Sequence, residues 1–140
     1  MADGKFSKPA RKLHSKDVLT LENRGGSWYY NEDGLTFVVE IIWIQGTVVA
    51  YNQDKSEVTL QDSGYNITVV NCHTIPGGNA WIDQGKYVMA VGELDNSNTR
   101  VKIRAIKMAD LSDNPVHQQT WKDEVTELKA LMRENKPLCR

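Results

Sequence analysis

The chain has 140 residues and a formal net charge of −1, with 40% hydrophobic and 25% charged residues. These values are typical of one globular domain and argue against a low-complexity or disordered protein. Unbroken apolar runs such as Ile41–Ile44 are too short to span a membrane, and the two cysteines, Cys72 and Cys139, lack the spacing of a metal site or a disulfide framework.

The beginning of the chain is basic. Residues 1–16 carry a net charge of +4, from Lys5, Lys8, Arg11, Lys12 and Lys16 against Asp3. We expect residues 1–12 to form a flexible basic arm. Such an arm either contacts phosphate, because lysine and arginine release its counterions, or is simply a solvated terminus. A weakly helical extension, residues 13–21, follows it.

Five strands are expected after this extension. The first, Leu35–Tyr51, is long and β-branched, and Gly46 interrupts it where a strand bends or bulges. The others are Glu57–Gln61 and Tyr65–Val70, joined by a turn at residues 62–64, and then Lys86–Leu94 and Arg100–Met108. This order, with an irregular connector between the third and fourth strands, predicts a mainly-β fold: a single OB-fold, the five-stranded Greek-key barrel, over residues 13–112. An SH3-like barrel is the alternative.

The last strand contains an unusual lysine. Arg100, Lys102 and Arg104 share one face of the strand, but Lys107 falls on the apolar face. Either Lys107 extends to a carboxylate such as Asp110, to solvent or to a partner, or a bulge after Ala105 reverses the alternation and turns Ile106 and Met108 inward.

A C-terminal helix is predicted over residues 113–136, followed by a tail at 137–140. Asp113 or Asn114 can cap it, and Pro115 suits its first turn. One apolar stripe runs along it, formed by Trp121, Val125, Leu128 and Met132. This stripe either packs against the chain's own barrel or docks onto a second OB-fold.

Direct, tight binding of single-stranded nucleic acid is not favoured. OB-folds that bind single strands use stacking aromatic residues and a basic groove. Here the second and third strands offer one aromatic residue, Tyr65, and one nearby basic residue, Lys55. The candidates for weak contacts with phosphate are the basic side chains Lys5, Lys8, Arg11, Lys12, Arg100, Lys102 and Arg104. No catalytic or metal-binding motif is present, so we expect no enzyme activity, no metal and no cofactor.

Several blocks of the sequence resemble the RecQ-mediated genome instability protein 2 family. They are Trp43–Val49, Gly85–Met89, Arg104–Met108 and Asp110–Pro115, the last followed by His117 and Trp121. The resemblance implies a non-catalytic OB-fold subunit that pairs with the C-terminal OB-fold of a larger RecQ-mediated genome instability protein. That pair joins a RecQ helicase and a type IA topoisomerase, topoisomerase III, in a nuclear complex that dissolves double Holliday junctions.

The resemblance also implies where partners bind. Lys107 and Trp121 would hold the partner, with Val125 and Leu128 behind them. The predicted interface is the last strand and the helix, namely Lys107, Met108, Trp121, Val125, Leu128 and Met132. A peptide from a Fanconi-anaemia helicase is a further expected partner. The chain would contact DNA mainly as part of the complex. An independent single-stranded-nucleic-acid-binding OB-fold protein is the alternative function.

Overall fold

The computed structural model describes residues 10–32, 34–95 and 101–135. The elements, in chain order, are β1 (Arg11–Lys12), α1 (Ser15–Leu19), β2 (Glu22–Arg24), β3 (Ser27–Glu32), β4 (Leu35–Val39), β5 (Ile41–Asn52), β6 (Glu57–Asp62), β7 (Tyr65–Val70), η2 (Cys72–Thr74), β8 (Tyr87–Asp95), β9 (Lys102–Asp110) and α2 (Val116–Asn135). In this part of the chain, no helix combines the length and the apolar character needed to cross a bilayer.

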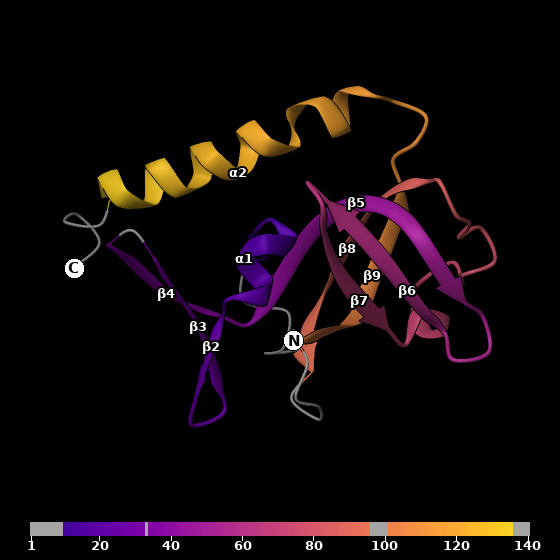
Figure 1. Cartoon of the computed structure of the whole chain (residues 1–140), viewed down its shortest axis with the longest axis horizontal. Helices are drawn as coiled ribbons and strands as arrows, with labels where there is room; N and C mark the ends of the chain where they lie inside the picture. Colours follow the sequence, from indigo (N-terminus) through magenta and orange to yellow (C-terminus); the bar gives the residue numbers. More distant parts are fainter. Residues whose placement is uncertain (1–9, 33, 96–100, 136–140) are drawn as a thin grey trace.

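Five strands close into a barrel in the order β5-β6-β7-β9-β8, with β8 pairing back to β5 (Figure 1). The pairing of β7 with β9 is parallel and the other four are antiparallel. This is the predicted OB-fold. Its core consists mainly of branched aliphatic side chains, among them Ile42, Ile44, Leu60, Val69 and Ile103.

The length of β5 lets it pair with two neighbours. Ile41–Thr47 pairs with β8, and Thr47–Asn52 pairs with β6. At Gly46, where the strand passes from one partner to the other, an added Cβ would lie 2.7 Å from the carbonyl oxygen of Gln61. The predicted break at Gly46 therefore marks a close backbone approach, which only glycine permits.

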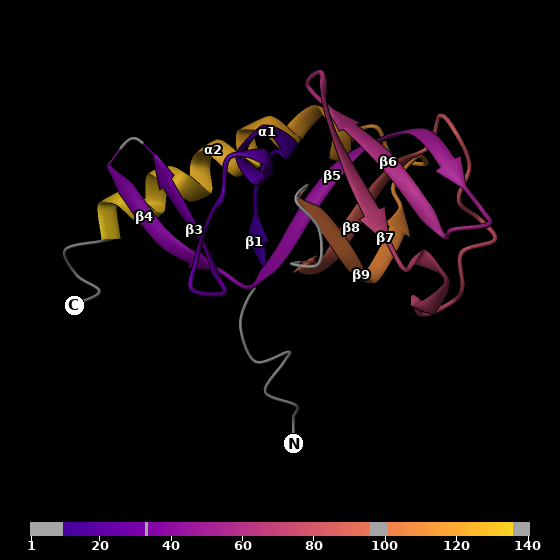
Figure 2. The same cartoon turned by 60° about the horizontal axis from the view of Figure 1, so that its bottom comes forward.

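The predicted first strand, residues 35–51, is two strands. The chain bends at Glu40, so that β4 joins β2 and β3 in a separate three-stranded sheet, while β5 enters the barrel. Side chains on one face of the small sheet, including Tyr30, Leu35 and Val39, complete the core beside α1. Figure 2 shows this sheet beside the barrel, with α2 passing behind it.

The predicted basic arm is only partly described. Residues 1–9 lie outside the described residues, as does the predicted tail. Arg11 and Lys12 form β1, which pairs in parallel with Ile42 and Trp43 of β5. These two basic residues are therefore part of the folded domain.

Candidate partner-binding surface

Apolar side chains also occupy the outer face of the barrel. Ile41, Met89 and Val91 form a second cluster, separate from the core, on β5 and β8. Around it pack the partly buried Ala10, Trp43, Ile106, Ala109 and Leu111. We call this set of eight residues the outer cluster. An OB barrel needs only its inner face to be apolar, so a second apolar face requires another explanation.

A bulge in β9 places Lys107 beside the outer cluster. Val91 pairs with Lys107 and Gly92 pairs with Ala105, so Ile106 is the extra residue. The bulge reverses the alternation, as one of the two interpretations predicted: Met108 is buried in the core. Ile106, however, turns outward into the outer cluster.

Lys107 is exposed. The proposed carboxylate partner, Asp110, instead accepts a hydrogen bond from Lys86 at 2.8 Å. This bond, together with bonds from Ser112, lowers the pKa of Asp110 to about 2. Lys107 therefore projects to solvent at the edge of an apolar surface.

The start of α2 is capped by Asn114. Its Oδ1 accepts a hydrogen bond from the backbone N–H of Val116 at 3.1 Å. Pro115 follows in the first turn, where its missing N–H has no partner to lose. The sequence offered Asp113 and Asn114 as alternatives for the cap.

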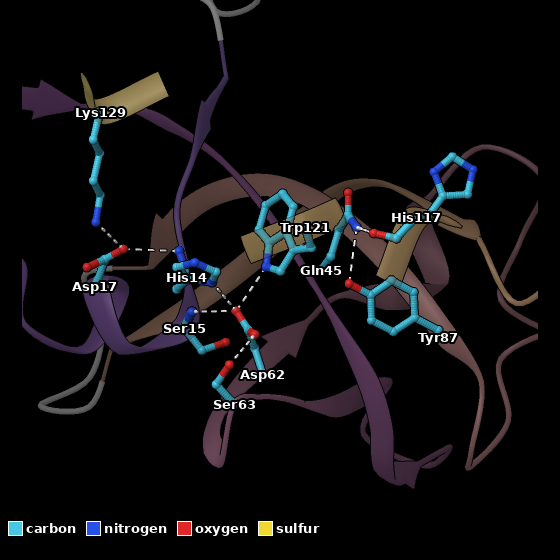
Figure 3. Close-up of polar contacts among 10 residues, drawn as sticks. All are labelled: His14, Ser15, Asp17, Gln45, Asp62, Ser63, Tyr87, His117, Trp121 and Lys129. Atoms are coloured by element: carbon cyan, nitrogen blue, oxygen red, sulfur yellow. Dashed lines mark hydrogen bonds and ion pairs between the residues drawn. The ribbon is translucent and has the colours of Figure 1, made fainter. Parts of the chain in front are cut away.

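The first half of α2 is attached through the carboxylate of Asp62, at the end of β6 (Figure 3). Its Oδ2 accepts hydrogen bonds from Trp121 Nε1 at 3.0 Å and from the backbone N–H of Ser15 at 3.3 Å, and lies 2.9 Å from His14 Nδ1. The His14 and Trp121 rings also meet in a T-shaped arrangement, with their centroids 5.7 Å apart. Trp121 is only 2% exposed and Val125 only 1%.

The environment of Asp62 favours its charged form. Burial by itself would raise the pKa of this carboxyl, but the hydrogen bonds from His14 and Trp121 outweigh burial and bring the pKa below its ordinary value. The attachment of α2 is therefore a charge-assisted contact between the N-terminal segment, the barrel and the helix.

Two further contacts hold α2 along its length. Lys129 Nζ donates to Asp17 Oδ2 at 2.7 Å and lies over the ring of Tyr30. Nearer the start of the helix, Gln45 Nε2 donates to Tyr87 Oη at 3.1 Å and to the carbonyl of His117 at 3.4 Å. Burial raises the pKa of Tyr87 to about 12, so it remains a neutral hydroxyl.

The predicted interface stripe on α2 is thus divided between two environments. Trp121 and Val125 pack on the chain's own domain, which agrees with the first of the two alternatives. Leu128 is 39% exposed, Leu131 is 51% exposed, and Met132 is partly buried against the core. Leu131 belongs to this exposed side although the predicted set of interface residues omitted it.

The basic side chains that were predicted to contact phosphate have different environments in the structure. Lys5, Lys8 and Arg100 lie outside the described residues. The guanidinium of Arg11 lies over Phe37, and the ammonium of Lys12 lies over Trp43 and pairs with Glu124 at 3.1 Å. Arg104 pairs with Glu93 and Asp95, and Lys102 is half-buried next to Asp95 in register.

The face that OB-folds use for single strands is polar and weakly charged here. The outward positions of β6 and β7 are Glu57, Thr59, Gln61, Asn66 and Thr68, and Gln61 bonds to Asn66. Tyr65, at the start of β7, is 45% exposed and is the one aromatic side chain exposed on these two strands, and the described outward positions include no cation. Within the described residues, no group of three or more His, Cys, Asp or Glu side chains is arranged to hold a metal ion.

Solved structures share this fold. A chain of the S. pombe Stn1–Ten1 complex superposes with a TM-score of 0.73 at 19% identity, over 94% of this chain and 98% of that one. A chain of a replication protein A heterotrimer bound to single-stranded DNA gives a TM-score of 0.70 at 15% identity, over 89% and 98%. At these identities the likeness shows the fold alone.

Sequence comparison shows more than the fold. The family model described as RecQ-mediated genome instability protein 2 matches residues 10–129. The chicken (Gallus gallus) protein of that name is 33% identical over 94% of this chain and 99% of its own length. The mouse (Mus musculus) protein is 38% identical over 62% of this chain and 57% of its own length. The chain therefore belongs to the RecQ-mediated genome instability protein 2 family.

Proposed function

We propose that this chain is a non-catalytic nuclear scaffold subunit. It pairs with the OB-fold of a larger RecQ-mediated genome instability protein, and the pair joins a RecQ helicase and topoisomerase III in the complex that dissolves double Holliday junctions. The observation that carries this proposal is the outer cluster, a second apolar face on a barrel whose core is already complete.

The outer cluster has the composition of a binding surface. Its central residues, Ile41, Met89 and Val91, are only 6–7% exposed, and among the partly buried residues around them is Trp43, of a residue type enriched in interfaces. Charged side chains border it, with Lys107 opposite Val91 and the pair of Arg104 and Glu93 further along β8 and β9. An apolar centre with a charged rim is typical of a protein–protein interface.

The exposed side of α2 extends this surface for a partner. Leu128 and Leu131 lie three residues apart, and therefore on one side of the helix. Trp121 has a different role in this proposal: it holds α2 in position through Asp62, so that its replacement weakens partner binding indirectly.

The scaffold proposal is tested by measuring the affinity of the whole chain for the OB-fold of the larger protein. Ile106→Asp, which puts a charge into the outer cluster, and Lys107→Glu, which reverses its bordering charge, are each expected to lower the affinity by about tenfold or more. Lys122→Glu is the matched control, because Lys122 is exposed on α2. Unchanged affinity for both variants would contradict the proposed surface.

A second arm of the experiment tests the alternative function. Fluorescence anisotropy with a labelled single-stranded oligonucleotide, at low and at physiological salt, measures binding by the isolated chain. We expect only weak binding that disappears as salt rises, because the outward positions of β6 and β7 carry no cation. Tight binding would instead support an independent single-strand-binding protein.

A further inference from the structure

Gln45 is a polar side chain on an apolar face of the barrel. On β5, Ile41, Trp43 and Gln45 share the outer face and alternate with the core residues Ile42 and Ile44. Gln45 is nevertheless only 3% exposed. Burying an amide has a free-energy cost unless the amide is hydrogen-bonded, so an apolar side chain would suit this position better if packing were its only role. The hydrogen bonds of Gln45 therefore indicate its role.

The amide of Gln45 joins three elements. Its Oε1 accepts a hydrogen bond from Trp43 Nε1, on β5, at 3.1 Å. Its Nε2 donates to Tyr87 Oη on β8 at 3.1 Å and to the carbonyl oxygen of His117, in the first turn of α2, at 3.4 Å (Figure 3). The nitrogen of the amide is thus fixed by the barrel and by α2, while its oxygen holds the indole of Trp43.

A second contact links the same indole to α2. The ammonium of Lys12 lies 4.6 Å from the centroid of the Trp43 ring and 3.1 Å from Glu124 Oε1 on α2. Thr120 Oγ1 donates to the other carboxylate oxygen of Glu124 at 3.0 Å. Because Lys12 and Glu124 are partly exposed, solvent screens their ion pair, and the buried amide of Gln45 is the firmer of the two links.

Trp43 is the side chain whose orientation this arrangement fixes. It belongs to the outer cluster and lies opposite Val91 of β8 in register. It is only half-buried, so water can satisfy its indole N–H and the fold does not require a protein acceptor there. The bond to Gln45 instead restricts the rotamer of Trp43. A side chain that is ordered before a partner binds loses less conformational entropy in the complex.

We propose that Gln45 is a positioning residue of the partner-binding surface, which fixes the indole of Trp43 relative to the first turn of α2. The outer cluster and α2 are two parts of that surface, and the amide holds them in one arrangement. This inference rests on the proposed scaffold function, because it concerns how the chain presents the surface assigned to the larger protein's OB-fold.

The first readout is the affinity of the whole chain for that OB-fold, measured by isothermal titration calorimetry. Gln45→Met keeps the length of the side chain but removes its hydrogen bonds, and is expected to lower the affinity about tenfold. Gln61→Met is the matched control, because Gln61 is an exposed glutamine on β6 whose side chain bonds to Asn66. We expect the control to bind as the wild type does.

A double-mutant cycle separates positioning from a loss of stability. In the Trp43→Phe background the indole N–H is absent, so Gln45→Met is expected to lower the affinity by no more than about a further twofold. If Gln45 only stabilised the fold or the attachment of α2, Gln45→Met would lower the affinity by the same factor in both backgrounds. That result would overturn the proposal.

Fluorine NMR of the chain labelled with 5-fluorotryptophan tests the positioning without a partner. The resonance of Trp43, assigned by its absence from Trp43→Phe, is expected to shift in Gln45→Met. The resonance of Trp81 should stay in place, because its indole donates to the carbonyl of Gly78 in the segment between η2 and β8. An unmoved Trp43 resonance would show that Gln45 does not orient the indole.

The positioning role and the scaffold function fail in different ways. If the wild type binds the OB-fold and Ile106→Asp weakens binding but Gln45→Met does not, the positioning role is wrong and the scaffold function stands. If the wild type does not bind, the scaffold function is wrong, and the positioning role fails with it.

Discussion

The carboxylate of Asp62 accepts hydrogen bonds from two segments that are distant from it in sequence. Ser15 lies 47 positions before it and Trp121 lies 59 positions after it. From the sequence, Asp62 belonged to an ordinary hairpin turn, because nothing in its neighbourhood indicates which distant donors it meets. A single buried acceptor thus joins the first half of the helix to both segments.

Asp62→Ala is expected to lower the free energy of unfolding by about 2–4 kcal/mol at neutral pH, because it leaves the buried donors of Trp121 and Ser15 without an acceptor. Urea unfolding measures the loss. Ser63→Ala is the control: the exposed Ser63 hydroxyl donates to the other oxygen of Asp62, and its loss should cost no more than about 0.5 kcal/mol.

The effect of Asp62→Ala should depend on pH in one direction. Since the pKa of Asp62 is lower in the folded state, its stabilisation is fully present above its ordinary value of 3.8 and is lost as the pH falls below it. The difference between wild type and variant should therefore shrink in acid. A difference that grew on acidification would contradict the contribution assigned to the carboxylate.

At the scale of elements, the pattern of hydrophobic residues predicted the barrel strands and the long helix, because their periods repeat over many residues. It did not predict β3 or the bend at Glu40. Trp28–Tyr30 is a continuous aromatic run without alternation, and Phe37–Ile44 is apolar on both faces, so neither stretch reveals which of two sheets it joins. The bulge at Ile106 appeared only as one of two interpretations of Lys107.

Gly92→Ala is expected to lower the free energy of unfolding by about 2–3 kcal/mol, because an added Cβ at the bulge would overlap the backbone carbonyl of Arg104. The urea unfolding midpoint is the measurement. Thr59→Ala, at a half-buried position on β6, serves as control and should cost at most about 1 kcal/mol. Equal stability of wild type and Gly92→Ala would contradict the close approach of the Arg104 backbone to Gly92.

At the scale of the whole molecule, α2 has two sides with different roles. One side, with Trp121 and Val125, completes the domain, while the other exposes Leu128 and Leu131. A stripe of apolar residues in a sequence does not distinguish these sides, because both repeat at three- and four-residue intervals. The sequence therefore predicted the helix but not which of its residues remain available to a partner.

The isolated chain is expected to self-associate weakly through this exposed side. Replacing both Leu128 and Leu131 by Lys should raise the dissociation constant of self-association about tenfold, which corresponds to ~1.4 kcal/mol of association free energy. Sedimentation equilibrium measures this constant. The double variant Thr126→Lys with Ala130→Lys adds the same charge at exposed positions of α2 and is the control. If the wild type stays monomeric at high concentration, the exposed side of α2 does not mediate self-association.

The position of Asp62 also has a consequence for the order of folding. Its acceptor site exists only after β6 and the N-terminal segment have come together, and α2, which supplies Trp121, is synthesised after both. Closing a loop of this length has an entropic cost, which the contacts of Trp121 offset only where this acceptor site is already formed. The barrel and the N-terminal segment together are therefore the template onto which the end of the chain docks.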